Sequence, residues 1–237
     1  MRFSTSIVPL VLVTSAFSSP ISVDSIVTDR TTDSFEEAVY ENGLDARQSA
    51  SLTANEFTNG GCKSVVLIFA RGTAQLGNLG ATPGLQLYNQ IKSALGASTI
   101  AVQGVNYDAE TAHGTLPEGV DATAAANMAT LIRTVANTCP SAKILLSGYS
   151  QGAAMVHASV KRLSTTVQAR INAAVTFGDT RNEQDGGQIP GISADRTLII
   201  CNDGDLVCDG TLQITSAHLA YGSRVPEAVS FLTSKVN

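Results

Sequence analysis

Charge is scarce in this sequence: Asp, Glu, Lys and Arg together make up 15% of its 237 residues, and the formal net charge is −5. A chain of this kind has no basic stripe to hold a nucleic-acid backbone, so we expect no nucleic-acid partner. Apolar residues, at 43%, are numerous enough for a sizeable core. Internal repeats and low-complexity stretches are also missing, and the length fits one domain once any leader is removed.

A hydrophobic run long enough to cross a membrane is absent as well, because the apolar stretch at residues 7–13 is too short for a bilayer. Met1 and Arg2 precede it and small residues follow it up to position 19, which is typical of a secretory signal peptide. The alternative is a marginal buried strand. We therefore expect residues 1–19 to direct a secreted, extracellular protein without a transmembrane segment.

Residues 20–47 are acidic and have little periodicity, which predicts a pro-segment or a disordered arm, with cleavage near Arg47. Residues 1–47 hold seven acidic and three basic side chains, that is −4 of the total of −5. The body at residues 48–237 is therefore almost neutral. Such a body suits an apolar or uncharged target.

Only four cysteines are present, and no CxxC spacing supports a zinc site, so we expect no metal. In an exported chain, four cysteines indicate two disulfides, for which three pairings exist. Cys201 and Cys208 enclose a short loop, whereas Cys62 and Cys139 each precede an apolar strand candidate. Because parallel strands start at one edge of a sheet, we pair Cys62 with Cys139 and Cys201 with Cys208.

Apolar runs without alternation, such as residues 65–69, predict strands that are covered on both faces. Strands are predicted at residues 64–70, 99–105, 143–147, 173–177 and 196–201, and helices at residues 83–95, 121–138, 151–167 and 226–236, after a helical turn at residues 52–57. This alternation is the doubly wound α/β pattern. The glycine-rich loop at residues 71–80 lacks the Walker and Rossmann spacings, so we expect no nucleotide and no cofactor.

The segment Gly148-Tyr149-Ser150-Gln151-Gly152 follows the third predicted strand. It predicts a nucleophile elbow with Ser150 at its apex, since a Cβ at either glycine would crowd the neighbouring strand or helix. The amide of Gln151 would then lie at a helix N-terminus, where it can donate to an oxyanion. A second donor is predicted at Thr73 in the loop at residues 71–80, although Thr73 alternatively only tightens the turn.

A nucleophilic serine of this class needs a carboxylate and a histidine, which follow it in that order. His113 precedes Ser150, and His157 lies two helical turns beyond it, where a surface or packing role is expected. His218 lies in a loop after the last strand and alone fits the order of a general base.

The acid is predicted to be Asp205, because a bridge from Cys201 to Cys208 would fix its loop and apolar residues follow it. Asp203 and Asp179 remain alternatives, and turn capping is their other explanation.

With these residues in place, the sequence resembles the fungal cutinases. The matching strings run from about Cys62 to the C-terminus and are Arg71-Gly72-Thr73, Gly77-Asn78, Cys139-Pro140, Gly148-Tyr149-Ser150-Gln151-Gly152, Phe177-Gly178-Asp179-Thr180-Arg181-Asn182, Asp195-Arg196-Thr197, Gly204-Asp205-Leu206-Val207-Cys208 and His218-Leu219-Ala220-Tyr221-Gly222. The resemblance implies a single lidless α/β-hydrolase-like catalytic domain over residues 48–237, with about five parallel strands and helices on both faces. It implies that Ser150 is the nucleophile, Asp205 the acid and His218 the base. Thr73 and Gln151 would form the oxyanion hole.

Two positions depart from the family pattern. Many relatives have Ser where this sequence has Thr73, whose hydroxyl is less freely aimed because its χ1 is stiff. An Asn usually stands roughly where Gly114 stands, beside His113.

Apolar side chains near the base and the nucleophile are expected to contact the acyl group, although ordinary packing under a loop is the alternative. They are Leu116, Tyr149, Leu212, Ile214 and Leu219.

The expected substrate is an apolar polyester or lipid-like ester, cutin, and the expected state is a monomer. A lipase or a short-chain or acetylxylan-type esterase is the alternative, although acetylxylan esterases look richer in cysteine. A secreted surface-binding protein without turnover is a further alternative, against which the intact Ser, Asp and His set argues.

Overall fold

The computed structural model describes residues 52–236. The predicted signal peptide at residues 1–19 and the acidic segment at residues 20–47 lie outside the described residues. Within residues 52–236, no helix is both long and apolar enough to cross a membrane.

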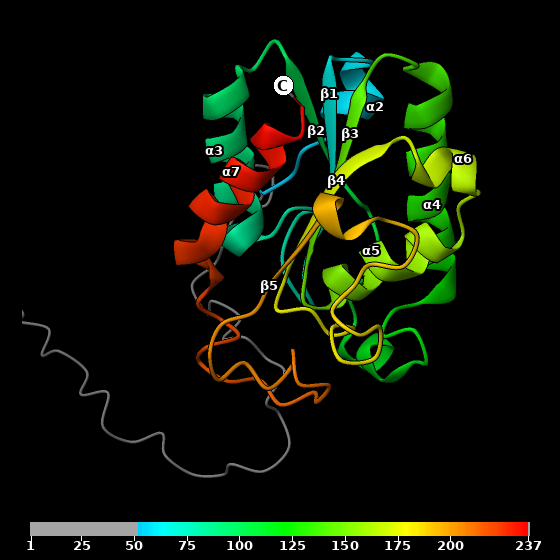
Figure 1. Cartoon of the computed structure of the whole chain (residues 1–237). Helices are drawn as coiled ribbons and strands as arrows, with labels where there is room; N and C mark the ends of the chain where they lie inside the picture. The colour runs from blue at the N-terminus through cyan, green and yellow to red at the C-terminus, as the bar shows by residue number, and fades with distance from the viewer. Residues whose placement is uncertain (1–51, 237) are drawn as a thin grey trace, which may run out of the picture. The chain divides into compact units, whose positions relative to one another are not determined.

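Five parallel strands form one sheet in the order β2-β1-β3-β4-β5 (Figure 1). Their bounds are β1 Val65–Ala70, β2 Ile100–Gly104, β3 Lys143–Tyr149, β4 Ile171–Phe177 and β5 Thr197–Ile200. Each strand matches a predicted one, although β3 ends later and β4 begins earlier than expected. β1 and β2 are buried along their whole length, as the unbroken apolar runs predict. The doubly wound α/β prediction is confirmed.

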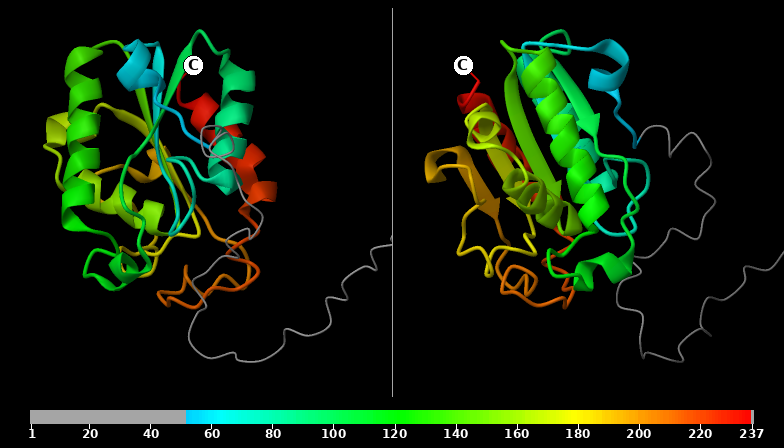
Figure 2. Two further views of the ribbon diagram at one scale, coloured as in Figure 1. Left: turned by 180° about the vertical axis from the view of Figure 1, so that it is seen from behind. Right: turned by 90° about the vertical axis from the view of Figure 1, so that its right-hand side faces the viewer.

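Helices cover both faces of this sheet, as Figures 1 and 2 show. α3 (Gln86–Leu95) and α7 (Val225–Ser234) lie on one face, and α4 (Ala122–Thr138) and α5 (Gln151–Lys161) lie on the other. The short elements are α2 (Glu56–Gly60), α6 (Thr165–Gln168), η1 (Ala81–Leu85), η2 (Thr111–Thr115), η3 (Ala194–Arg196) and η4 (Tyr221–Arg224).

Two cores hold the layers together. Successive side chains of a strand point to opposite faces, so Val66 and Ile68 of β1 join the core beneath α4 and α5. Leu67 and Phe69 join the core beneath α3 and α7. The sheet is therefore fixed from both sides, and so are the loops at the ends of its strands.

The helix boundaries differ from the prediction in three places. The helix predicted at residues 151–167 is wrong in its extent, because α5 ends at Lys161 and a separate α6 follows. Ser164 caps α6, since its hydroxyl accepts a hydrogen bond from the N–H of Val167. The helix predicted from residue 83 begins at Gln86, after an extended Thr82. The turn expected at residues 52–57 lies further along the chain, at α2.

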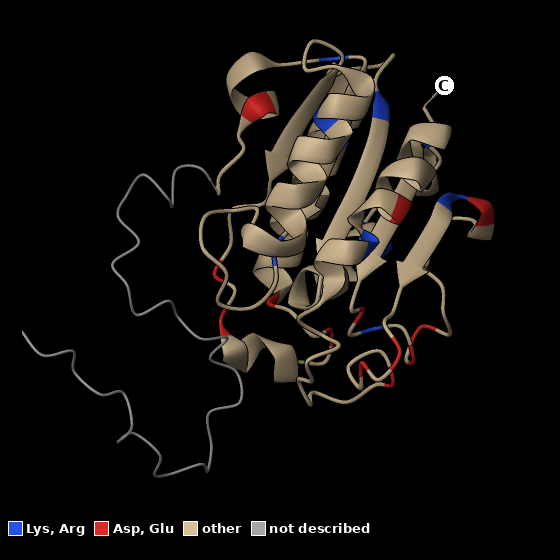
Figure 3. Cartoon of the chain, turned by 90° about the vertical axis from the view of Figure 1, so that its left-hand side faces the viewer, with Lys and Arg blue, Asp and Glu red and all other residues tan. Residues whose placement is uncertain are grey.

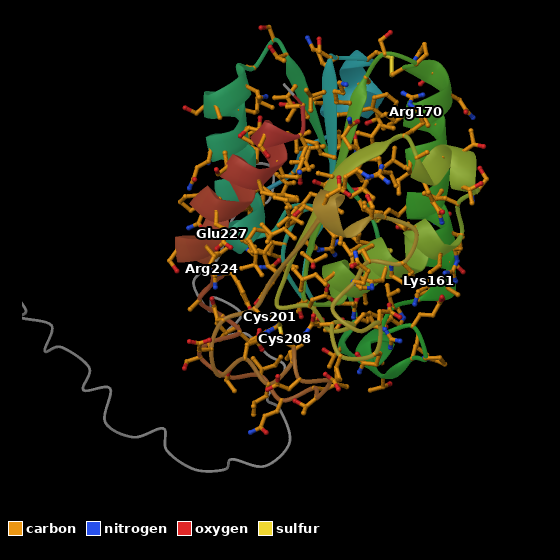
Figure 4. The ribbon with its side chains drawn as sticks, in the orientation of Figure 1. Lys161, Arg170, Cys201, Cys208, Arg224 and Glu227 are labelled. Atoms are coloured by element: carbon orange, nitrogen blue, oxygen red, sulfur yellow. A yellow bond between two sulfur atoms is a disulfide. The ribbon has the colours of Figure 1, made fainter. Side chains whose placement is uncertain are left out.

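Both disulfides have the pairing expected from the sequence. Cys62–Cys139 joins the segment before β1 to the end of α4, with 5.6 Å between the Cα atoms. Cys201–Cys208 encloses the loop after β5 and lies among the loops at the carboxyl ends of the strands (Figure 4). The first bridge has a sequence separation of 77 residues, and in the loop-entropy model a bridge of that span stabilises the fold by about 4 kcal/mol.

The passage from β3 to α5 is a sharp turn with Ser150 at its apex. Ser150 has a φ of 55°, which residues other than glycine rarely adopt. A Cβ at Gly148 would lie 2.1 Å from the carbonyl oxygen of Gly152, and a Cβ at Gly152 would lie 2.0 Å from that of Ala70. The two glycines therefore let α5 approach β1 and β3 closely, as the motif predicts.

We expect Gly152→Ala to lower the free energy of unfolding by about 3 kcal/mol, because the added methyl group meets backbone that cannot move aside. In a domain of this size that corresponds to a fall in Tm of roughly 6–12 °C. Gly60→Ala is the matched control, since a Cβ there meets nothing within 4 Å. Circular dichroism follows both melts, and equal Tm values for the two variants would contradict the close approach.

Candidate active site

Three side chains that are distant in sequence form one series of hydrogen bonds. Ser150 follows β3, whereas Asp205 and His218 lie between β5 and η4. The Nε2 of His218 lies 3.0 Å from the Oγ of Ser150, and its Nδ1 lies 2.9 and 3.0 Å from the carboxylate oxygens of Asp205. All three side chains are buried. The structure thus brings together the Ser, Asp and His that the sequence order singles out, in the geometry of a catalytic triad.

The carboxylate of Asp205 is held by two further donors. The N–H of Val207 donates to its Oδ1 at 3.0 Å, and the hydroxyl of Tyr221 donates to its Oδ2 at 2.5 Å. Although burial opposes ionisation, hydrogen bonds from His218 and Tyr221 hold the pKa of Asp205 below its ordinary value. Burial and this same carboxylate raise the pKa of Tyr221. Asp205 therefore faces the imidazole as an anion.

Two tyrosine rings enclose the imidazole of His218. The ring of Tyr149 stacks on it, with 5.3 Å between centroids, and its hydroxyl donates to the backbone carbonyl of His218 at 3.0 Å. The ring of Tyr221 meets it edge-on, at 87°. These contacts restrict the orientation of the imidazole.

Of these two tyrosines, the sequence predicts only Tyr149 as a site residue, and in a different role. Tyr149 is expected from the sequence to contact the acyl group, yet its side chain is 4% exposed and supports His218 from within. Sequence reasoning overlooked Tyr221 as a site residue. The available signal was its place in the string that begins at His218, three residues further on.

Gln151 and Thr73 lie close together beside the nucleophile. The Nε2 of Gln151 donates to the carbonyl oxygen of Glu110 at 2.8 Å and lies 3.4 Å from the Oγ1 of Thr73. Gln151 is also the first residue of α5, where N–H groups have no acceptor within the helix. This placement suits the two donors expected for an oxyanion hole.

The loop that carries Thr73 is fastened by the buried side chain of Gln75. Its Oε1 accepts a hydrogen bond from the N–H of Gly72 at 2.9 Å, and its Nε2 donates to the carbonyl of Thr82 at 2.7 Å. At Gly114, the second position that departs from the expected family pattern, a Cβ would meet nothing within 4 Å.

The rival candidates have other partners or none in the triad. The Nδ1 of His113 lies 3.2 Å from the backbone carbonyl oxygen of Asp108, and Asp203 is exposed. Asp179 is buried, but its Oδ2 lies 2.9 Å from the Nε2 of His157 and not against His218. Of the two roles expected for His157, the surface role is wrong, because the side chain is 1% exposed.

Exposed leucines mark the loops at the carboxyl ends of the strands. Within residues 52–236 the exposed large apolar side chains are Leu76, Leu116, Leu212 and Leu219. They follow β1, β2 and β5 in the chain, so they lie in loops at the sheet edge where the triad forms. Three of them are predicted acyl contacts, whereas Leu76 was overlooked. Ile214, also predicted, is half-buried.

A polar pocket of about 710 Å³ lies beside the loop that carries Thr73. Arg71, Tyr107 and Glu110 line it, whereas Ser150 and His218 do not. Figure 3 shows several Asp and Glu positions, in red, along the loops at this end of the sheet. Even so, no group of His, Cys, Asp and Glu side chains in the described range could hold a metal ion.

A family model described as Cutinase matches residues 61–236. The chain belongs to the cutinase family. This cutinase-family chain is 49% identical over 236 residues to the protein named Cutinase CUT2 of Pyricularia oryzae, with 100% of each chain covered. It is 41% identical over 228 residues to Probable cutinase 1 of Aspergillus niger, covering 95% of this chain and 81% of that one. A solved structure of Trichoderma reesei cutinase in complex with a C11Y4 phosphonate inhibitor aligns with a TM-score of 0.71 and 34% identity, covering 78% of this chain and 80% of that one.

These cutinases establish the reaction class of the chain, which is a carboxylic ester hydrolase. The resemblance to fungal cutinases noted in the sequence is confirmed. So is the cutinase fold, a five-stranded parallel sheet between helices, without a separate lid domain in residues 52–236.

We expect Tyr221→Phe to lower the free energy of unfolding by about 1.5–3 kcal/mol, because the buried carboxylate of Asp205 loses a hydrogen bond from a hydroxyl that nothing replaces. Circular dichroism at neutral pH measures this loss from the melting curve.

Tyr88→Phe is the matched control for this measurement. Tyr88 lies in α3 and also donates its hydroxyl to a carboxylate, that of Glu56, at 2.8 Å. Its loss should cost less stability, because the carboxylate of Glu56 is partly exposed and keeps Lys92 as a partner. An unchanged melting curve in Tyr221→Phe would show that the hydroxyl does not stabilise the carboxylate of Asp205.

Proposed function

We propose that the chain is a secreted serine esterase that acts as a monomer and hydrolyses the ester bonds of cutin, a polyester of hydroxy fatty acids. The observation that carries the proposal is the unbroken series of hydrogen bonds from Ser150 through His218 to Asp205. The cutinase family supplies the reaction class, ester hydrolysis, and the names of the relatives support cutin as the substrate.

Acylation begins when the Nε2 of His218 takes the proton of Ser150 while the Oγ attacks the ester carbonyl carbon. The carbonyl electron pair moves onto oxygen, and the N–H groups of Thr73 and Gln151 stabilise the resulting anion. When the intermediate collapses, the bond to the alcohol breaks and His218 gives its proton to that alcohol. Asp205 stabilises the imidazolium during both transfers.

Deacylation repeats the sequence with water. His218 takes a proton from the water as its oxygen attacks the acyl carbon, and the same N–H groups stabilise the second anion. The bond to Ser150 then breaks, and His218 returns the proton to its Oγ. The carboxylic acid leaves, and the enzyme is restored without a metal or cofactor.

The exposed leucines support an apolar substrate. Leu116, Leu212 and Leu219 keep large apolar surfaces in water at the edge of the sheet where Ser150 lies. An acyl chain laid against them would remove that surface from water, which is favourable. A polyester presents many such chains, so its binding gains more from these leucines than that of a short soluble ester.

Secretion is supported by the disulfides and by the N-terminal pattern. Both bridges in the described part of the chain are of a kind that persists in oxidising compartments. The composition of residues 1–19 is that of a signal peptide.

Ser150→Ala should lower kcat for a p-nitrophenyl ester by at least about 10⁴-fold, because no other group can form the acyl-enzyme. A phosphonate should label Ser150 in the native chain, as mass spectrometry would show, and should not label the variant. Ser159→Ala is the matched control: this serine lies in the same helix, where its hydroxyl donates to the carbonyl of Val156. Undiminished activity in Ser150→Ala would refute the mechanism.

Leu212→Ser and Leu219→Ser should each slow the release of hydroxy fatty acids from cutin by about 10-fold, while leaving p-nitrophenyl acetate hydrolysis near its original rate. The reason is the lost burial of a leucine, worth about 1.5–3 kcal/mol. Radiolabelled cutin beside soluble esters measures both rates. Cleavage of triglyceride or acetylated xylan but not cutin would favour a lipase or an acetylxylan-type esterase, and no cleavage of any ester would favour a binding protein.

A further inference from the structure

A second histidine and two carboxylates form a buried cluster outside the triad. The Nε2 of His157 lies 2.9 Å from the Oδ2 of Asp179, and its Nδ1 lies 2.7 Å from the Oδ2 of Asp185. His157 and Asp179 are buried almost completely. Asp185 is also paired with Lys161, whose side chain is partly exposed on α5 (Figure 4). The ester hydrolysis described above does not use this cluster.

The cluster needs a charged imidazole. A neutral imidazole has one N–H, so only the imidazolium can donate to carboxylates at both ring nitrogens. Burial opposes this charge, but Asp179 and Asp185 outweigh it and raise the pKa of His157. The hydrogen bond from His157 lowers the pKa of Asp185 to about 2. The cluster is therefore an ion triplet of one cation between two anions.

Asp179 connects this ion triplet to the turn after β4. Its Oδ2 accepts a hydrogen bond from the hydroxyl of Thr176 at 2.6 Å, and its Oδ1 accepts one from the N–H of Arg181 at 2.8 Å. The carboxylate thus closes the turn between residues 176 and 181. His157 fixes that carboxylate from α5, the helix that begins directly after Ser150.

The same turn holds the nucleophile and borders the base. The N–H of Ser150 donates to the carbonyl of Phe177 at 3.0 Å, and the hydroxyl of Thr180 lies 3.4 Å from the carbonyl oxygen of Ser150. A Cβ at Gly178 would lie 2.7 Å from the Cε1 of His218, so this backbone packs against the imidazole. A shift of the turn would move Ser150 and His218 relative to each other.

We propose that His157 is a positioning residue for ester hydrolysis, which acts through Asp179 and the turn at residues 176–181 to hold Ser150 and His218 at bonding distance. The inference rests on the proposed roles of Ser150 and His218. Misplacement of reacting groups by about 1 Å can cost about 100-fold in rate, so a slackened turn is expected to lower kcat more than it changes KM.

If the ion triplet holds the turn, kcat should fall when His157 loses its proton at alkaline pH. The groups that face His157 are Asp179 and Asp185 from the segment after β4, and Lys161 from its own helix. The neighbouring α4 carries Arg133, which donates instead to Thr130 and to the carbonyl of Arg162. Because the folded pKa of His157 is raised, the contribution of the triplet is complete below about pH 6.5, the ordinary pKa, and is lost as the pH rises through the folded value.

The experiment compares kcat and KM for a soluble p-nitrophenyl ester between pH 6 and pH 10. In the native chain, kcat should fall reversibly at alkaline pH while circular dichroism stays native. His157→Gln should have a kcat about 10-fold lower at pH 7, a KM within about twofold, and no alkaline fall, since the amide does not titrate. Glu227→Gln is the control: it breaks the partly exposed ion pair between Glu227 of α7 and Arg224 of η4 (Figure 4) and should change neither quantity.

A second variant keeps the test decisive if His157→Gln does not fold. The double variant His157→Gln, Asp179→Asn replaces the cation and one of the two anions with amides, while Asp185 keeps its ion pair with Lys161, and it should again lack the alkaline fall. A kcat within twofold of the native value and an unchanged pH profile in either folded variant would overturn the proposal. Ser150→Ala in the same assay separates the two ideas, because activity without Ser150 would defeat the proposed function instead.

Discussion

The backbone of Ser150 is the constraint on which the rest of the site depends. Its φ of 55° and ψ of −119° place the residue in a sparsely populated region, which costs of order 1–3 kcal/mol. Such a conformation persists only where the surroundings fix it. Here the glycines at 148 and 152 admit α5 against the sheet, and the turn after β4 holds the amide of Ser150. The packing of both cores therefore keeps one hydroxyl raised above the sheet.

Two histidines with carboxylate partners, His218 and His157, pack against the turn at residues 176–181. The group that faces the other ring nitrogen of each histidine decides its role. The Nε2 of His218 faces the hydroxyl of Ser150, so it can take a proton from it. Both nitrogens of His157 face carboxylates, so neither can serve as a base. Tyr221 and Val207 also donate to Asp205, which holds the carboxylate against the imidazole that it orients and stabilises. The same pair of residue types thus performs chemistry in one place and holds the backbone in the other.

The sequence predicted the features that depend on interactions within short stretches of the chain. Unbroken apolar runs identified all five strands, and the glycines around Ser150 identified the elbow, because a tight strand-to-helix turn permits few residue types. The order of residues selected His218 as the base, whereas Asp205 was preferred to Asp203 and Asp179 because a bridge from Cys201 to Cys208 would fix its loop. What it missed depends on tertiary contacts. The break before Ser164 directly follows three good helix formers, Lys161, Arg162 and Leu163. The partners of His157 and Tyr221 come from segments that meet only in the folded chain.

The two disulfides have different effects because they lie in different parts of the fold. The bridge from Cys62 to Cys139 spans most of the first half of the domain at the edge opposite the triad, and its effect is on the unfolded chain. The bridge from Cys201 to Cys208 closes a separation of only 7 residues, which adds less loop entropy than the longer bridge, but its loop holds Asp205. Expression of the chain in a reducing cytosol would therefore have two separate effects. Loss of the Cys62–Cys139 bridge would lower the melting temperature. Loss of the Cys201–Cys208 bridge would loosen the loop that holds Asp205 in a molecule that is otherwise folded.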